Sequence, residues 1–149
     1  MKLELLKKKF TGKRILITGN TGFVGSWLSV LLHLMGAKIL GYSLKKKDKR
    51  FLSNTSEFKK KIKTIYSDIN NFDKNLNKIK KFKPQIVIHL ASQPLVLESY
   101  INTRKTYATN IMGTVNFFET IKKIKSITKV IVFTSDKVYR NLEGKILNE

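Results

Sequence analysis

Cysteine is absent from the 149 residues of this chain, and no apolar run is long enough to cross a membrane. Without cysteine the chain forms no disulfide and offers no thiolate ligand, which suits a reducing compartment, and we predict no metal site. The longest apolar stretch, residues 27–37, is too short for a bilayer span and contains His33. Because the lysine-rich residues 1–9 lack the pattern of a signal peptide, we expect a cytoplasmic protein without a membrane partner.

Acidic residues are also scarce, since 10 of them stand against 30 lysines and arginines, for a net charge of +20. Only four of the basic residues are arginines, and the lysines are scattered along the chain. Nucleic-acid sites favour arginine with interleaved aromatic residues, so we do not expect a nucleic-acid partner. Codons rich in A and T account for the abundance of Lys, Ile, Asn and Phe. The charge would still speed the encounter with anionic nucleotides.

Short apolar runs alternate with helical patterns over a length that suits one domain. Strands are predicted at residues 14–18, 38–43, 63–67, 85–90 and 129–134, and helices at residues 24–35, 55–62, 72–82 and 102–125. Residues 1–12 form a basic amphipathic lead-in. The first, fourth and fifth strands are almost wholly apolar, as in parallel strands covered on both faces. The sequence therefore predicts an α/β fold with a doubly wound parallel (Rossmann) sheet ordered 3-2-1-4-5. The pattern stops soon after the fifth strand.

The last predicted helix carries apolar residues at helical spacing. They are Tyr107, Ile111, Val115, Phe118 and Ile121. This spacing predicts an amphipathic helix.

A glycine-rich turn joins the first strand to the first helix after it, with the spacing Gly19-x-x-Gly22-x-x-Gly25. Glycines allow a tight turn and bring backbone N–H groups close to a pyrophosphate, which the helix N-terminus also attracts. A plain tight turn is the alternative interpretation. We predict dinucleotide binding by Gly19, Thr21, Gly22, Phe23, Val24 and Gly25.

Further candidate cofactor residues follow the third and fourth strands. The carboxylate of Asp68, next to Ile69, can accept a hydrogen bond from an adenine amino group, although an Asp here can also cap a helix. Small residues after the fourth strand allow close approach of a cofactor ribose, so Leu90, Ala91, Ser92 and Gln93 are predicted to line the site. His89 is interpreted as a packed strand residue.

The second strand ends in Ser43, where dinucleotide folds usually place the Asp or Glu that receives the ribose hydroxyls. With Lys45, Lys46 and Lys47 beside it, NADP is not excluded. Thr109 is a further candidate for cofactor binding. Its neighbour Asn110 either anchors a buried water or backbone group, or faces solvent.

The end of the fifth strand places a hydroxyl, a carboxylate and an amine on Ser135, Asp136 and Lys137. A hydroxyl can hold a substrate oxygen, a carboxylic acid can protonate a leaving group, and an amine can take a proton. The alternative is a polar turn in which the carboxylate pairs with the lysine. We predict Ser135, Asp136 and Lys137 as catalytic residues.

Four segments resemble the extended short-chain dehydrogenases, specifically the CDP-glucose 4,6-dehydratases. They are residues 18–28, 91–96, 107–114 and 134–139, and the similarity runs from about Lys13 to Tyr139. The glycine motif is shared across the superfamily. The segments Gln93-Pro94-Leu95-Val96 and Ser135-Asp136-Lys137 are more specific, because sister dehydratases typically carry Thr-Asp-Glu at the latter.

The resemblance implies that NAD is the cofactor and that CDP-glucose is converted to CDP-4-keto-6-deoxyglucose for polysaccharide biosynthesis. Ser135 would bind the 4-hydroxyl, Asp136 would protonate the departing 6-hydroxyl, and Lys137 would stand where sister families place the base for the C5 proton. The complete enzymes allow a homo-oligomer. Residues 1–149 would then be the amino-terminal part of an NAD-binding domain, without the substrate domain.

These enzymes use a Tyr-x-x-x-Lys pair on the helix after the fifth strand, and this chain ends at Glu149 before such a helix. Tyr42 and Lys46 match the spacing but straddle the end of the second strand, so we interpret them as unrelated to catalysis. We expect the chain alone to be inactive. A related epimerase or dehydratase, a non-catalytic dinucleotide sensor and a lysine-rich nucleic-acid binder remain as alternatives.

Overall fold

Five parallel strands form one sheet in the order β3-β2-β1-β4-β5, as the sequence predicts. The computed structural model describes residues 2–45 and 52–135. The strands are β1 (Arg14–Thr18), β2 (Lys38–Ser43), β3 (Lys63–Tyr66), β4 (Ile86–His89) and β5 (Lys129–Val132). In the register, Ile15 of β1 lies opposite Ile39 of β2 and Ile86 of β4. The central strand is therefore β1, which runs directly into the glycine turn.

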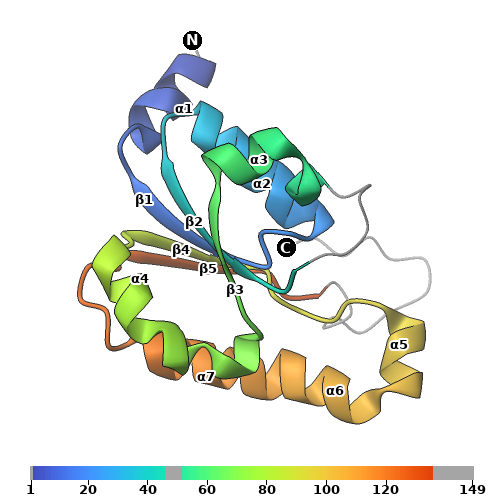
Figure 1. Ribbon diagram of the computed structural model, residues 1–149. Coiled ribbons are helices and arrows are strands. Elements are labelled where there is room, and N and C mark those ends of the chain that lie inside the picture. The colour runs from blue at the N-terminus through green and yellow to red at the C-terminus, as the bar shows by residue number, and fades with distance from the viewer. Residues whose placement is uncertain (1, 46–51, 136–149) are drawn as a thin grey trace, which may run out of the picture.

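Helices cover both faces of the sheet (Figure 1). On one face lie α1 (Lys2–Phe10), α2 (Phe23–Leu34) and α3 (Ser56–Lys61), and on the other lie α4 (Leu76–Phe82), α6 (Thr103–Tyr107) and α7 (Gly113–Ile121). The short helix α5 (Val96–Ile101) follows β4. Three 3₁₀ turns, η1 (Leu52–Asn54), η2 (Ile69–Asn71) and η3 (Asp73–Asn75), and the π-helical turn η4 (Ala108–Met112) complete the described elements.

Alternation along the strands divides the core in two. Ile15 and Ile17 pack with Leu32 and Phe58 on the side of α2 and α3. Leu16 and the other strand residues of opposite parity pack with the aromatic and aliphatic side chains of α4 and α7 on the second side. Successive side chains of a strand point to opposite faces, so a sheet with helices on both sides needs apolar residues throughout its central strands.

The predicted long helix over residues 102–125 is three consecutive pieces. It begins at Thr103 as α6, widens into η4 and continues as α7 to Ile121. The predicted helix over residues 72–82 likewise starts with η3 and becomes α-helical only from Leu76. Helix α5 was not predicted from the sequence. A helical period in the sequence does not distinguish α-helical from 3₁₀ or π hydrogen-bond spacing.

Apolar side chains are exposed in two segments of the structure. In strand β5, which the sequence predicts to be covered on both faces, Val130 and Ile131 are 40% and 48% exposed. On the last helix, four of the five apolar residues at helical spacing, Tyr107, Ile111, Val115 and Phe118, face outward, whereas Phe117 and Ile121 are buried. The described sheet ends at β5, so this edge strand has a partner on one side only.

Candidate functional site

Most of the predicted site residues lie in segments that follow the carboxyl ends of the strands. Backbone hydrogen bonds continue beyond the strands there: Ser67 N donates to Ser43 O, Gly19 N to Tyr42 O, Leu90 N to Thr18 O, and Phe133 N to His89 O, at 2.8–3.2 Å. These bonds join the ends of all five strands in their spatial order. The segments after β1, β2, β3, β4 and β5 thus start from one common edge, which is where ligands bind in doubly wound sheets.

The glycine turn packs against the segment after β4, backbone on backbone. Gly19 has a φ of 72°, in the left-handed region, and a Cβ at this position would lie 2.7 Å from the carbonyl carbon of Leu90. A Cβ on Gly25 would overlap the carbonyl oxygen of Gly19. Side chains at these positions would push the two segments apart, so glycine is required for the close approach.

The N-terminus of α2 is open toward this edge. The helix begins at Phe23 after the cap residue Gly22, and no side chain caps it. Phe23 and Val24 are 76% and 52% exposed. Unpaired N–H groups and the helix dipole favour an anion at such an end, and this helix has 12 residues. The turn and helix therefore fit the pyrophosphate of a dinucleotide.

Thr21 and Ser43 join the glycine turn to the end of β2. Their hydroxyl oxygens lie 2.7 Å apart, and Thr21 also donates to the carbonyl oxygen of Leu44 at 2.8 Å. Asn20 is fully buried behind the turn, where it donates to Thr64 at 2.9 Å, and its Oδ1 has no partner among the described residues. The end of β2 thus carries the hydroxyl of Ser43 instead of a carboxylate.

Asp68 has the geometry of a helix cap. Its Oδ1 accepts from the backbone N–H of Asn70 at 2.9 Å and from the side-chain amide of Asn70 at 3.0 Å, at the start of η2. Ile69 is 5% exposed and belongs to the core on the side of α7. A contact of these two residues with adenine stays a prediction.

The loop after β4 is held by Asn110. Its Oδ1 accepts from Gln93 N at 2.8 Å and its Nδ2 donates to Gln93 O at 3.1 Å. Of the two readings of this residue, the backbone anchor is therefore the one observed. The Gln93 side chain in turn accepts from Leu95 N at 2.6 Å. Ser92 is exposed, and Leu90, Ala91 and Thr109 are half-buried beside this loop.

His89 is buried at the end of β4 and has three described partners. Its Nδ1 lies 2.7 Å from Thr18 Oγ1, its Nε2 lies 3.3 Å from Thr114 Oγ1, and its ring stacks on Phe117 with centroids 4.1 Å apart. Burial lowers the pKa of His89 to about 4, so the ring is neutral at physiological pH. Thr18 and Thr114 were missed in the sequence, because no pattern distinguishes them from other threonines.

Tyr42 is a core residue. It is fully buried, its ring meets that of Phe72 edge-on at 4.7 Å, and its hydroxyl donates to the carbonyl oxygen of Asp68 at 2.8 Å. Burial raises the pKa of Tyr42, which is opposite to what a catalytic tyrosinate needs. Lys46 lies outside the described residues. This geometry agrees with the interpretation that the pair at 42 and 46 is not catalytic.

Of the three predicted catalytic residues, the structure describes only Ser135, which is exposed beyond the end of β5. Asp136 and Lys137 lie outside the described residues. Because the backbone N–H of Phe133 donates a hydrogen bond to the carbonyl oxygen of His89 at 3.0 Å, the chain leaves β5 next to the loop that follows β4. The catalytic roles of all three residues remain predictions.

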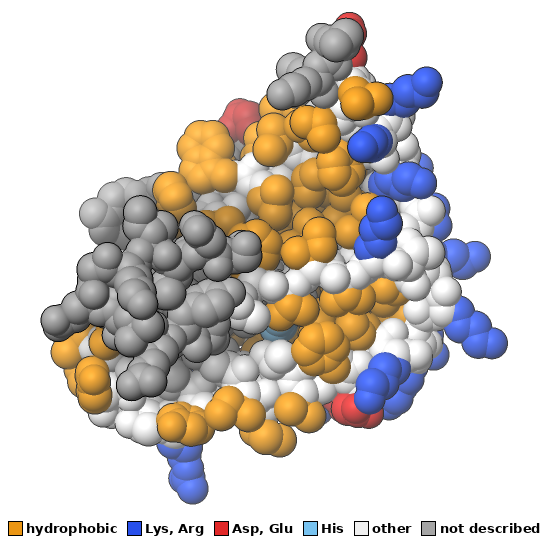
Figure 2. All heavy atoms as spheres, turned by 180° about the vertical axis from the view of Figure 1, so that it is seen from behind, with side chains coloured by type: hydrophobic (Ala, Val, Ile, Leu, Met, Phe, Trp, Pro, Cys, Tyr) orange, Lys and Arg blue, Asp and Glu red, His pale blue; other side chains and the backbone are white. Residues whose placement is uncertain are grey.

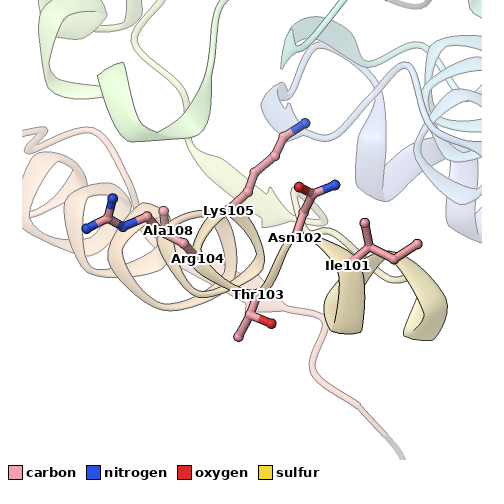
Figure 3. A pocket seen from close by; sticks show the side chains of 6 residues that line it. All are labelled: Ile101, Asn102, Thr103, Arg104, Lys105 and Ala108. Atoms are coloured by element: carbon pink, nitrogen blue, oxygen red, sulfur yellow. The ribbon is translucent and has the colours of Figure 1, made fainter.

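A hollow of about 550 Å³ lies at the bend between α5 and α6, away from the glycine turn. It is lined by Ile101, Asn102, Thr103, Arg104, Lys105 and Ala108. Figure 3 shows Arg104 and Lys105 pointing in different directions, so the two cations do not converge on one anion. Among residues 2–45 and 52–135, no helix is long and apolar enough to span a bilayer.

A parallel sheet with a tight glycine turn and an uncapped helix at the carboxyl end of its central strand defines a Rossmann-type α/β protein. The chain belongs to the GDP-mannose 4,6 dehydratase family, whose profile matches residues 16–149. It is therefore related to sugar-nucleotide dehydratases and epimerases and has their NAD-binding type of fold.

The curated relatives include a CDP-glucose 4,6-dehydratase from Salmonella typhimurium, with 44% identity over 92% of this chain and 38% of the relative. A CDP-paratose 2-epimerase from Salmonella typhi is 29% identical over 91% of this chain and 40% of the relative. Among solved structures, the epimerase Mth375 from Methanothermobacter thermautotrophicus matches all of this chain and 43% of its own, with a TM-score of 0.82 and 25% identity. The chain thus spans about two fifths of these relatives.

Proposed function

We propose that this chain is the cofactor-binding part of an NAD-dependent dehydratase that converts CDP-glucose to CDP-4-keto-6-deoxyglucose. The observation that carries the proposal is the 44% identity, over 92% of the chain, to a protein named CDP-glucose 4,6-dehydratase. The glycine turn and the open N-terminus of α2 support it, because they fit the pyrophosphate of a dinucleotide.

When bound, NAD would supply an acceptor for hydride from the sugar's C4 and a donor of hydride to C6. The proton of the 4-hydroxyl would go to the tyrosine of the Tyr-x-x-x-Lys pair that the resembling enzymes use. The backbone N–H groups of Gly22, Phe23 and Val24 would hold the pyrophosphate of NAD at the start of α2. Ser135 binds the 4-hydroxyl of the sugar, Asp136 protonates the departing 6-hydroxyl, and Lys137 accepts the C5 proton. The last role requires a lowered lysine pKa, which burial by substrate would supply.

A sugar-nucleotide epimerase is the second candidate. It is favoured by the 25% identity and the TM-score of 0.82 to Mth375, which is described as an epimerase. The two candidates differ in outcome, because a dehydratase product has lost water and an epimerase product keeps the mass of its substrate.

Binding can be tested on the 149-residue chain with NAD in a calorimeter. Phe23→Asp places a carboxylate in the first turn of α2, where it favours the helix but repels a pyrophosphate. We expect it to weaken NAD binding roughly tenfold, which is about 1.4 kcal/mol. Leu34→Asp puts the same charge at the exposed far end of α2 and should leave binding unchanged. Equal NAD affinity in the Phe23 variant and the wild type would refute the assigned pyrophosphate position.

The substrate can be tested in a chimera in which this chain replaces the matching part of the Salmonella typhimurium relative. Mass spectrometry should detect a product of CDP-glucose that has lost one water. UDP-glucose and dTDP-glucose should react more slowly. A product of unchanged mass would favour the epimerase instead.

A further inference from the structure

The hydroxyl of Thr18 makes three hydrogen bonds at the base of the glycine turn. It accepts from the backbone N–H of Ala91 at 3.2 Å and from that of Leu90 at 3.1 Å, which is shared with the carbonyl oxygen of Thr18, and it lies 2.7 Å from Nδ1 of His89. A hydroxyl has one proton to give. Since both amides can only donate, that proton goes to His89, and Nδ1 is the acceptor.

This assignment fixes the tautomer of His89. With Nδ1 unprotonated, the neutral ring carries its proton on Nε2, which donates to Thr114 Oγ1 at 3.3 Å. The Thr114 hydroxyl then donates to the carbonyl oxygen of Asn110 at 2.7 Å. Asn110 is the residue whose amide holds both backbone groups of Gln93.

We propose that His89, Thr18 and Thr114 act as positioning residues for the cofactor, by fixing the loop at residues 90–93 against the glycine turn. The three form a directed chain of hydrogen bonds from β1 through β4 to α7. Each of its ends reaches this loop: Thr18 holds Leu90 and Ala91, and Thr114 reaches Gln93 through Asn110.

The position of this loop matters because the loop packs directly against the glycine turn. Leu90 is the residue that a Cβ on Gly19 would strike, at 2.7 Å. The orientation of the His89 ring is also restricted by stacking, since one face of the ring lies on Phe117 at an interplanar angle of 18°. A loop fixed from three elements is pre-organised, and pre-organisation lowers the cost of binding.

The inference rests on NAD binding to the wild-type chain, and the test separates the two. Thr114→Val removes the hydroxyl at nearly constant volume, and His89→Phe keeps a ring to stack on Phe117 but removes both nitrogens. We expect NAD binding to weaken about fivefold to tenfold in each, because each variant removes two hydrogen bonds of the chain and only part of their stabilisation is transmitted to the cofactor site. Thr114→Ser should stay within about twofold of the wild type. Thr120→Val is the matched control, because Thr120 lies on α7 and is 1% exposed.

Nitrogen chemical shifts of His89 test the assigned direction of the hydrogen-bond chain, and the NAD affinities test its effect on the cofactor. At neutral pH they should show an unprotonated Nδ1 and a protonated Nε2 in the wild type, and in Thr114→Val the Nε2 shift should change. If the wild type binds no NAD, the proposed function fails. If it binds, the positioning role fails when Thr114→Val binds equally well, when Thr120→Val loses as much affinity, or when Nδ1 carries the proton.

Discussion

At the scale of single residues, buried polar side chains gather around one turn. Thr18, Asn20, Thr21, Ser26, Ser29 and His89 are each at most 3% exposed, and all lie in or beside the glycine turn. Ser53, 1% exposed, donates to the carbonyl oxygen of Thr21 at 3.2 Å. Burying a polar group is unfavourable unless it is hydrogen-bonded, and most polar groups in this cluster are. The hydrogen bonds of these buried side chains fix the conformation of the glycine turn, so the cluster coincides with the candidate site.

A depressed histidine pKa makes stability depend on pH. His89 titrates near 6.5 when unfolded and near 4 when folded, so between these values the unfolded state binds the extra proton. Stability from this group is complete above pH 6.5 and is lost as the pH falls toward 4, by at most about 3 kcal/mol. The ring's described neighbours, Thr18, Thr114 and Phe117, carry no charge.

Urea unfolding at a series of pH values measures this dependence. His89→Phe should flatten the part of the stability curve between pH 6.5 and 4, whereas His33→Gln, which changes the other of the two histidines, should leave it in place. A wild-type curve with the same slope as that of the His89 variant would contradict the depressed pKa.

At the scale of elements, the start of α7 packs very closely against the turn η2. Gly113 begins α7, and a Cβ there would lie 2.5 Å from Cγ2 of Ile69 in η2. The preceding π-helical turn η4 contains Asn110, whose side chain reaches Gln93. Such turns widen a helix by one residue and often occur at functional sites. The tight contact and the turn together set where Asn110 meets the loop after β4.

Gly113→Ala tests this contact. At an open helix position the change from Gly to Ala stabilises by about 1 kcal/mol. Overlap with Ile69 should reverse the sign here and destabilise the chain by about 1–2 kcal/mol in urea unfolding.

Ile69→Leu supplies the control, because leucine has no β-branch to meet the new methyl group. We expect Gly113→Ala to be less destabilising in the Ile69→Leu background than in the wild type. A stabilising Gly113→Ala in the wild type would show that α7 is not closely packed at this point.

At the scale of the whole molecule, a high positive charge coexists with a large apolar surface. The outer face of α2 exposes Phe23, Val24, Trp27, Leu31 and Leu34, and the region of β5 exposes Val130, Ile131 and Phe133. Figure 2 shows hydrophobic side chains gathered on the side of the molecule seen from behind, with lysines and arginines along its margin. Apolar surface of this kind favours association, whereas a net charge of +20 makes copies of the chain repel one another.

Salt should therefore promote self-association of the 149-residue chain. At about 1 M salt the Debye length is about 3 Å, so repulsion is screened while apolar contact is not. Light scattering should show association increasing with sodium chloride, and less so in the double variant Trp27→Gln, Leu31→Gln. Tyr66→Gln, on the opposite edge strand β3, is the control. Scattering that does not change with salt would contradict the view that charge repulsion keeps the apolar surfaces of two copies apart.

Local signals were enough for the strands and the glycine turn. All five strands lie within two residues of their predicted ends, because short apolar runs bounded by glycine, proline or charge leave little choice. The anchoring role of Asn110 was one of two open readings, since an interior helical asparagine is unusual in any case. The helix boundaries after residue 68 were predicted less well, because 3₁₀, π and α turns share similar residues.

The sequence by itself determined the sheet order, because alternating strands and helices are typical of a doubly wound sheet. It also determined the place of the glycine turn, since the turn's spacing and its position between strand and helix are local properties. Tertiary structure alone decided which polar groups meet there. Thr18, His89 and Thr114 are 25 or more residues apart, and only the pairing of β1 with β4 and the packing of α7 bring them together. Hydrogen bonds act over about 3 Å, and no pattern along a chain reports such distances between remote residues.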